Sequence, residues 1–194
     1  MNGLEDVIVA AAEVEAFCRG HGWRFCFIGG VAVQRWGMPR FTQDVDLTLM
    51  TGLGHEVKFI DTLLEIFSPR LENARQLALE RRVLLARTGG LVDLDIALGA
   101  FPFEEASVGR ATPWHVNGLV TLTTCCAEDL IIHKVFAARD RDWGDVESIL
   151  VRQFGGLDLT HIRRELPPLL ELKDDTESME KLERMMATVK KRSR

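Results

Sequence analysis

The alternation of apolar and polar residues between Asp44 and Met50 constrains the fold more than any other feature of this sequence. Three polar residues alternate there with three apolar ones, in the order Asp44, Val45, Asp46, Leu47, Thr48 and Leu49. Because successive side chains of a β-strand point to opposite faces, the pattern predicts a half-buried strand over 44–50. One face of this strand should lie in a hydrophobic core, and the other should carry both aspartates.

A helix and a buried strand are predicted ahead of this segment. The periodic apolar residues of 4–18 indicate a helix, and the apolar run 25–28 indicates the strand. Gly29 and Gly30 interrupt that strand and lead into a short helix over 31–36. Two glycines at the start of a helix expose backbone N–H groups without a side chain in the way, an arrangement that suits a phosphate oxygen.

A second pair of aspartates follows in another predicted strand. The segments 82–87 and 91–98 read as strands joined through a turn at Gly89 and Gly90, after a helix over 56–67. Asp93 and Asp95 alternate with apolar residues, so both carboxylates should point to the same face.

Carboxylates on one face of a strand indicate a cation site. Asp44 and Asp46 would repel each other unless cations lie between them, and Mg²⁺ is the hard, oxygen-preferring cation that best leaves positions open for substrate phosphates. Asp93 or Asp95 on a neighbouring strand would supply a third carboxylate. Two cations held in this way could clamp an attacking hydroxyl and a leaving pyrophosphate, with the nearest carboxylate helping to remove the proton.

The remainder of the chain is predicted to be mainly helical. A hairpin is expected for 112–116 and 119–123 around Asn117 and Gly118, followed by helices near 127–139, 142–153, 158–172 and 176–190. We therefore expect a core over 1–125 and a C-terminal helical segment over 126–194 that packs on it.

Composition narrows the classes of protein that need to be considered. The 194 residues are 46% apolar, and no apolar run approaches the roughly 20 residues of a membrane helix, which predicts a cytoplasmic protein without membrane contact. The net charge of −5 argues against a protein that coats nucleic acid nonspecifically. Four cysteines without metal-finger spacing are expected to be reduced and mostly buried: Cys18, Cys26, Cys125 and Cys126.

The motifs resemble those of a known superfamily. Phe27-Ile28-Gly29-Gly30, followed by Thr42-Gln43-Asp44-Val45-Asp46-Leu47, resembles the signature of the polymerase-beta-like nucleotidyltransferases. The downstream sequence is similar to the AbiEii-type group of bacterial nucleotidyltransferases. That similarity comprises Leu91–Leu94, Pro102–Ala106, Ala127–Lys134, Arg139, Asp142, Asp145 and Val146, and the whole resemblance spans about residues 23–152.

The resemblance implies a fold and a set of site residues. The fold is α/β (α+β), a mixed β-sheet with flanking helices and a C-terminal helical segment. Mg²⁺ is held by Asp44, Asp46 and Asp93, where Asp93 is preferred as the match to the third carboxylate and Asp95 is the alternative. The nucleoside triphosphate is bound by Gly29, Gly30, Thr42, Lys134 and Asp145, and the catalytic set is Asp44, Asp46, Asp93 and Lys134.

Three features have competing interpretations. Lys134 could neutralise triphosphate charge or be an exposed helix lysine. Asp145 and Asp142 could orient Lys134 or the substrate, and a plain helix-start role is the alternative for Asp142. The basic run could line an acceptor channel for RNA or be surface charge, and it comprises Arg70, Arg75, Arg81, Arg82 and Arg87.

The expected activity is a magnesium-dependent transfer of a nucleotidyl group from a nucleoside triphosphate to an acceptor hydroxyl. The 3′ end of an RNA or a protein is the preferred acceptor, and a small molecule is a third candidate. Many AbiEii-type proteins are toxins of toxin–antitoxin systems, so an antitoxin partner is implied as well. The alternatives are a catalytically silent nucleotide-binding module and a subunit whose 176–190 helix docks a partner.

Overall fold

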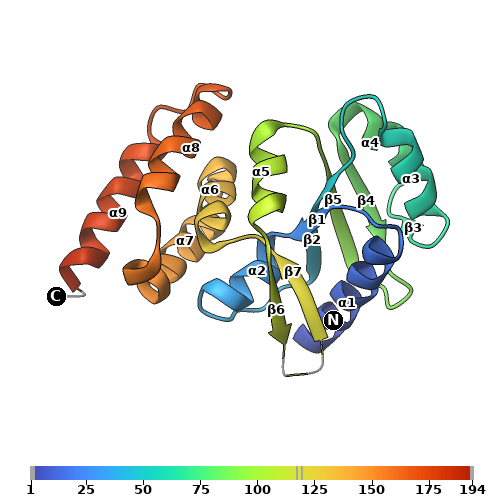
Figure 1. Cartoon of the computed structure of the whole chain (residues 1–194), viewed down its shortest axis with the longest axis horizontal. Coiled ribbons are helices and arrows are strands. Elements are labelled where there is room, and N and C mark those ends of the chain that lie inside the picture. The colour runs from blue at the N-terminus through green and yellow to red at the C-terminus, as the bar shows by residue number, and fades with distance from the viewer. Residues whose placement is uncertain (1–2, 117, 119, 193–194) are drawn as a thin grey trace. The chain divides into compact units, whose positions relative to one another are not determined.

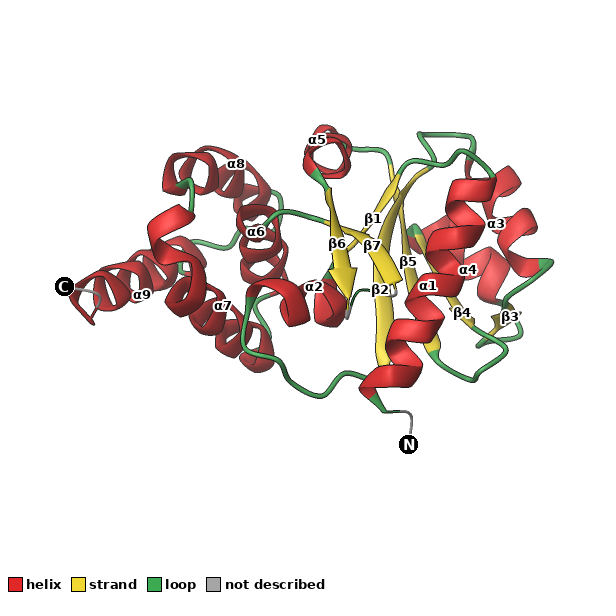
Figure 2. Ribbon diagram, turned by 60° about the horizontal axis from the view of Figure 1, so that its bottom comes forward, coloured by secondary structure: helices red, strands yellow, loops and turns green. Residues whose placement is uncertain are grey.

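The computed structural model describes residues 3–116, 118 and 120–192, and these residues form two compact units. The first comprises residues up to Val31 together with Phe41–Cys125, and the second comprises Ala32–Arg40 together with Cys126 onward. The sequence analysis predicted a single boundary between the core and the helical segment after residue 125. In the structure the short segment 32–40 belongs to the second unit as well. Figures 1 and 2 show the elements of each unit.

The first unit is a mixed sheet with helices. Its elements are α1 (Leu4–Gly20), β1 (Phe25–Phe27), the start of α2 (Gly29–Trp36), β2 (Asp44–Met50), α3 (Glu56–Leu64), β3 (Ser68–Pro69), α4 (Ala74–Arg81), β4 (Val83–Arg87), β5 (Asp93–Gly99), α5 (Pro102–Arg110), β6 (Thr112–Val116) and β7 (Val120–Thr124). The expected α/β class with a mixed sheet and flanking helices is confirmed.

The seven strands form one sheet in the order β3-β4-β5-β2-β1-β7-β6. Strand β2 lies between β5, with which it is parallel, and β1, with which it is antiparallel. The expected hairpins are present, because β4 pairs with β5 and β6 pairs with β7, both antiparallel. The predicted turn residue Asn117 and the predicted strand residue Leu119 lie outside the described residues.

One face of the sheet is covered by the hydrophobic core. The inward side chains of β2, Val45, Leu47 and Leu49, are fully buried in the same cluster as Leu94 of β5 and Val14 of α1. Figure 2 shows α1, α3 and α4 along the sheet, and all three helices contribute residues to this cluster. The alternation of β2 and β5 therefore turns their aspartates away from the core.

Two helices of this unit were not predicted. Helix α4 buries only Ala74 and Ala78, and α5 buries only Ser107 and Val108. Small and polar residues carry almost no apolar periodicity, so the pattern on which helix prediction rests is missing in both segments. The two-residue strand β3 is too short to give an alternation signal.

The second unit is helical. After the second part of α2 it contains α6 (Ala127–Ala137), α7 (Asp140–Gln153), a 3₁₀ turn (Phe154–Gly156), α8 (Leu159–Glu171) and α9 (Ser178–Arg192). Helix α9 buries Leu182, Met186 and Val189 against its own unit, which removes these residues from a docking face. The basic end of the chain is described as far as Arg192. Within the described residues, no helix is both long and apolar enough to cross a membrane.

Cysteine usage agrees with the expectation. Cys18, Cys26 and Cys125 are buried, Cys126 is partly exposed, and none of the four forms a disulfide. Burial raises the pKa of the Cys18 thiol to about 12, and the nearby Glu15 carboxylate acts in the same direction. Cys18 is therefore a protonated packing group rather than a nucleophile or a metal ligand.

The packing of β2 against the core predicts a large cost for truncation. Replacing Leu47 with alanine should lower the free energy of unfolding by about 2–5 kcal/mol, because a fully buried side chain leaves a cavity between sheet and helix. Urea unfolding followed by circular dichroism measures this. Leu53→Ala is the matched control, since Leu53 is 65% exposed, and its change should stay below about 0.5 kcal/mol. Equal effects of the two substitutions would contradict the core assignment.

Candidate active site

Four carboxylates lie on the face of the sheet that points away from the core. Asp44 pairs in register with Asp93, and Asp46 pairs with Asp95, across the parallel strands β2 and β5. All four are partly exposed, whereas the residues between them are buried. The structure therefore brings together the Asp-x-Asp pair and both candidates for the third carboxylate.

Gly29 and Gly30 lie directly against this acidic face. The Gly30 N–H donates a long hydrogen bond of 3.3 Å to Asp46 Oδ2. Gly29 has φ +55°, and a Cβ at this position would lie 1.9 Å from the same carboxylate oxygen. Helix α2 begins at Gly29 itself, two residues earlier than predicted, so both glycines belong to its first turn.

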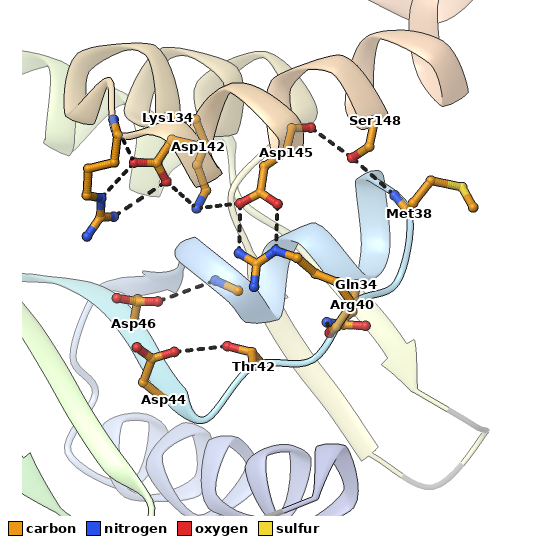
Figure 3. Close-up of polar contacts among 12 residues, drawn as sticks. Gln34, Met38, Arg40, Thr42, Asp44, Asp46, Lys134, Asp142, Asp145 and Ser148 are labelled. Atoms are coloured by element: carbon orange, nitrogen blue, oxygen red, sulfur yellow. Dashed lines mark hydrogen bonds and ion pairs between the residues drawn. The ribbon is translucent and has the colours of Figure 1, made fainter.

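Thr42 positions the first aspartate of the pair. Its side chain is 3% exposed, and its Oγ1 donates a 2.9 Å hydrogen bond to Asp44 Oδ1. A Cβ at Gly30 would lie 2.2 Å from this hydroxyl oxygen. Figure 3 shows the hydrogen bond from Thr42 to Asp44 and the one from the Gly30 backbone to Asp46. Thr42 was predicted to bind nucleotide, and its contacts here support a role in orienting Asp44.

Asp93 and Asp95 differ in how they are compensated. Asp93 meets two arginines, since Arg87 Nε lies 2.7 Å from its Oδ1 and Arg70 Nε lies 3.4 Å from its Oδ2. Asp95 pairs with Arg70 Nη1 through Oδ1. The pKa of Asp95 is raised, chiefly by burial and further by the Asp44 and Asp93 charges, and Arg70 offsets part of this rise.

The pairing of these arginines was only partly visible in the sequence. Arg87 faces Asp93 across the β4–β5 hairpin, a register that the Gly89–Gly90 turn could have suggested. Arg70 follows the edge strand β3 and donates its backbone N–H to Leu85 O. No local pattern predicts that contact, because it depends on the pairing of a strand with only two residues.

A second cluster of charged residues lies in the helical unit. Lys134 Nζ lies 2.9 Å from Asp142 Oδ1 and 2.8 Å from Asp145 Oδ2, and all three side chains are at most 6% exposed. Arg40 donates to both oxygens of Asp145, at 2.6 and 2.7 Å. Figure 3 shows this chain of ion pairs. The interpretation in which Asp145 orients Lys134 therefore has a direct contact in its favour.

The two alternatives for Asp142 are both present in the structure. Its Oδ2 accepts the Arg139 backbone N–H at 3.3 Å, which is a helix-start contact of α7, while Oδ1 faces Lys134. Burial raises the pKa of the Asp142 carboxyl, but hydrogen bonds from Arg139 and Lys134 outweigh it and leave the pKa below its ordinary value. The pKa of Asp145 is lowered in the same way, with Arg40 and Lys134 opposing the effect of burial.

The donor set of the acidic face fits a divalent cation that shares its ligands with a substrate. Within residues 3–116, 118 and 120–192, no three His, Cys, Asp or Glu side chains form a ready metal cage. Mg²⁺ sites of nucleotide enzymes usually have one or two carboxylates, with water and phosphate oxygens completing the octahedron. Asp44 and Asp46 present that minimal set of oxygen donors.

Comparison with known proteins addresses the fold. No protein-family model and no curated protein matches the chain. The structure superposes on an antigenic nucleotidyltransferase-like protein from Paracoccidioides brasiliensis with a TM-score of 0.57 and 13% identity, covering 91% of this chain and 92% of that one. The chain therefore has the fold of a nucleotidyltransferase-like protein.

Two further structures superpose less closely. The lincosamide antibiotic adenylyltransferase LnuA with bound lincomycin gives a TM-score of 0.48 and 12% identity, over 76% of this chain and 98% of that one. The antibiotic-resistance factor ANT(2″)-Ia in complex with adenylyl-2″-tobramycin gives 0.43 and 18% identity, over 98% and 97%.

The close approach of Gly29 to Asp46 predicts that an added methyl group is costly. Gly29→Ala should lower the free energy of unfolding by about 1–3 kcal/mol, because the alanine must adopt a positive φ and displace the carboxylate. Thermal unfolding measures the loss. Gly89→Ala serves as the control, since nothing lies within 4 Å of its Cβ position. A Gly29→Ala protein as stable as this control would show that the close approach is wrong.

The lowered pKa of Asp145 predicts a pH-dependent contribution to stability. A carboxyl whose pKa is lower in the folded state stabilises the protein above its unfolded pKa of about 4, and this stabilisation is lost as the pH falls through the folded value. Asp145→Asn should therefore lower the free energy of unfolding by about 3 kcal/mol at pH 7 and by progressively less as the pH falls below about 4. Urea unfolding at several pH values measures the difference.

Glu147→Gln on the same helix provides the comparison for this prediction. Glu147 is exposed and lies 3.7 Å from Arg192. Its substitution should change stability by less than about 1 kcal/mol at every pH. A difference between wild type and Asp145→Asn that stays constant from pH 7 to pH 2 would contradict the electrostatic account.

Proposed function

We propose that this protein is a metal-dependent nucleotidyltransferase that moves a nucleotidyl group from a nucleoside triphosphate to an acceptor hydroxyl. The observation that carries the proposal is the position of Asp44 and Asp46 on one face of β2, between the Gly29–Gly30 turn and the aspartates of β5. The nucleotidyltransferase-like fold supports it. Mg²⁺ is the proposed cofactor, held by Asp44 and Asp46.

The reaction is a displacement at the α-phosphorus of the triphosphate. The acceptor oxygen forms a bond to this phosphorus, the bond to the bridging oxygen of the β-phosphate breaks, and pyrophosphate leaves with that electron pair. The proton of the acceptor hydroxyl passes to a carboxylate of β5. When bound, Mg²⁺ supplies positive charge for the attacking and leaving oxygens. The protein contributes mainly position and charge stabilisation.

The contacts of β5 favour Asp95 as the third carboxylate, although the family motif points to Asp93. Both carboxylate oxygens of Asp93 pair with an arginine. In Asp95 only Oδ1 pairs with Arg70, and Oδ2 takes no part in this ion pair. A carboxylate with an uncommitted oxygen is the better ligand or proton acceptor. Asp95 also interacts electrostatically with Asp44, so a cation beside Asp44 would stabilise both charges.

On the side of the triphosphate, Gly29 and Gly30 provide the backbone surface against which the phosphates are proposed to lie. Lys134 and Asp145 remain proposed nucleotide-binding residues on the resemblance alone. Because Lys134 is buried between two carboxylates, its substitution affects folding as well as nucleotide binding. It is therefore a poor first test of the function.

The finer assignments rest on the resemblance to the AbiEii-type group. They are an RNA 3′ end or a protein as acceptor, a role in a toxin–antitoxin system with an antitoxin partner, and a cytoplasmic location.

Neutralising the Asp-x-Asp carboxylates should weaken metal-dependent nucleotide binding strongly. We expect isothermal titration calorimetry to show binding of one or more nucleoside triphosphates to the wild type in the presence of Mg²⁺. The double variant Asp44→Asn/Asp46→Asn should bind at least about tenfold more weakly, which corresponds to about 1.4 kcal/mol or more. It should unfold at the same temperature as the wild type or higher, because the repulsion between the carboxylates is relieved.

Asp61→Asn is the control for this experiment. Asp61 is an exposed carboxylate of the same unit that pairs with Arg75, so the substitution removes a negative charge away from the acidic face. It should leave nucleotide binding unchanged. Binding that is retained in the double variant, or that needs no divalent cation in the wild type, would overturn the proposed function.

A further inference from the structure

Two arginines extend the acidic face along the sheet. Across the antiparallel β4–β5 pair, Arg87 lies opposite Asp93 and Leu85 lies opposite Asp95. The backbone N–H of Arg70 donates to Leu85 O, so Arg70 lies next to Leu85 and continues the line from Asp46 through Asp95. The β2–β5–β4 side of the sheet therefore carries a row from Asp44 to Arg87 and a row from Asp46 to Arg70.

The guanidinium groups of both arginines retain donors that their ion pairs do not use. Each guanidinium has five N–H donors. Arg70 uses Nε and Nη1 toward the aspartates, and Arg87 uses Nε. Within the described part of the chain, no contact engages Nη2 of Arg70 or either terminal nitrogen of Arg87. Their side chains are 25% and 41% exposed, so an incoming ligand can reach them.

The order of the strands assigns these arginines to one side of the reaction. Gly29 and Gly30 follow β1, which lies on one side of β2, whereas β5 and β4 lie on the other side. In an in-line displacement the attacking oxygen approaches the phosphorus opposite the leaving group. If the pyrophosphate leaves on the glycine side, as the proposed function requires, the acceptor enters over β5 and β4.

We propose that Arg70 and Arg87 bind a phosphate group of the acceptor, next to the hydroxyl that is modified. Guanidinium groups match phosphate geometry through paired N–H donors, and they repel a cationic acceptor. Cations bound at the carboxylates would compete for the charge of Asp93 and Asp95 and leave the arginines less compensated. The proposed acceptor is therefore a nucleotide or a polynucleotide with a free hydroxyl rather than a cationic molecule.

Binding of defined probes tests this inference apart from turnover. The probes are adenosine 5′-monophosphate, a short single-stranded oligoribonucleotide with a 3′ hydroxyl, and spermidine, each titrated in Mg²⁺ at several salt concentrations. Wild type should bind at least one phosphate-bearing probe and should not bind spermidine. Similar affinity for the mononucleotide and the oligonucleotide indicates a free nucleotide as acceptor, whereas binding of the oligonucleotide alone indicates a polynucleotide. Failure of both phosphate-bearing probes to bind overturns the inference.

Arginine variants connect the binding to the two residues. Arg70→Gln and Arg87→Gln should each weaken binding of the phosphate-bearing probe about tenfold or more, because a charged hydrogen bond is lost. With an oligonucleotide, each should also reduce the slope of log affinity against log salt by about 1. Arg70→Lys and Arg87→Lys retain the charge and should restore the salt slope while affinity stays reduced. Unfolding temperatures establish that every variant is folded.

Arg75→Gln is the matched control, since Arg75 is an exposed arginine of the same unit that pairs with Asp61. It should leave both affinity and salt slope unchanged. Equal effects of Arg75→Gln and the two test substitutions would overturn the inference, as would binding of spermidine at similar affinity. If Mg²⁺ and nucleoside triphosphate bind normally while the arginine variants bind the probes like wild type, the inference fails and the proposed function stands. If the wild type does not bind the triphosphate, the proposed function itself fails.

Discussion

Repulsion among four carboxylates on two adjacent strands is the constraint on which the first unit depends. Asp44, Asp46, Asp93 and Asp95 share one face because β2 and β5 are parallel and paired residue for residue. The pKa of Asp95 is raised chiefly by its burial, and the charges of Asp44 and Asp93 act in the same direction. Arg70 and Arg87 compensate the β5 pair, whereas the described contacts of Asp44 include only a neutral hydroxyl donor, that of Thr42. The β5 pair is therefore compensated by arginines, and an added cation beside Asp44 would be stabilised by a carboxylate whose described partner is neutral.

Gly29 and Gly30 leave room for the acidic strand because they have no side chains. Asp46 and Thr42 occupy the positions that a Cβ of Gly29 and of Gly30 would take. The same absence that would let a phosphate approach the backbone thus lets the acidic strand pack against the start of α2. The Gly30 N–H already points to Asp46 at 3.3 Å, a long bond that a stronger acceptor could replace at little cost. Both the packing of β2 and the proposed phosphate binding therefore require residues without a Cβ at positions 29 and 30.

The part of the site that alternation determines could be predicted from the sequence. Strands β2 and β5 follow from period-two patterns, as do the shared face of Asp44 and Asp46 and that of Asp93 and Asp95, and the structure confirms them. The register that places Asp44 beside Asp93 could not be derived, because parallel pairing depends on a long connection rather than on a turn. Arg70 was missed as a partner of Asp95 because its position depends on the pairing of β3, a strand of only two residues. Helices α4 and α5 were missed because they bury mostly small residues.

The charge of the Lys134 cluster limits what this lysine can do. Lys134 is held between Asp142 and Asp145, so the three side chains together carry one negative charge and alone would repel a triphosphate. Arg40 and Arg139, at the two ends, bring the set to three cations and two carboxylates and reverse the sign. Any attraction of an anion to this cluster therefore comes from the arginines as much as from the lysine. A role for Lys134 in nucleotide binding would have to leave both carboxylates paired, since a buried carboxylate without a partner costs about 3–5 kcal/mol.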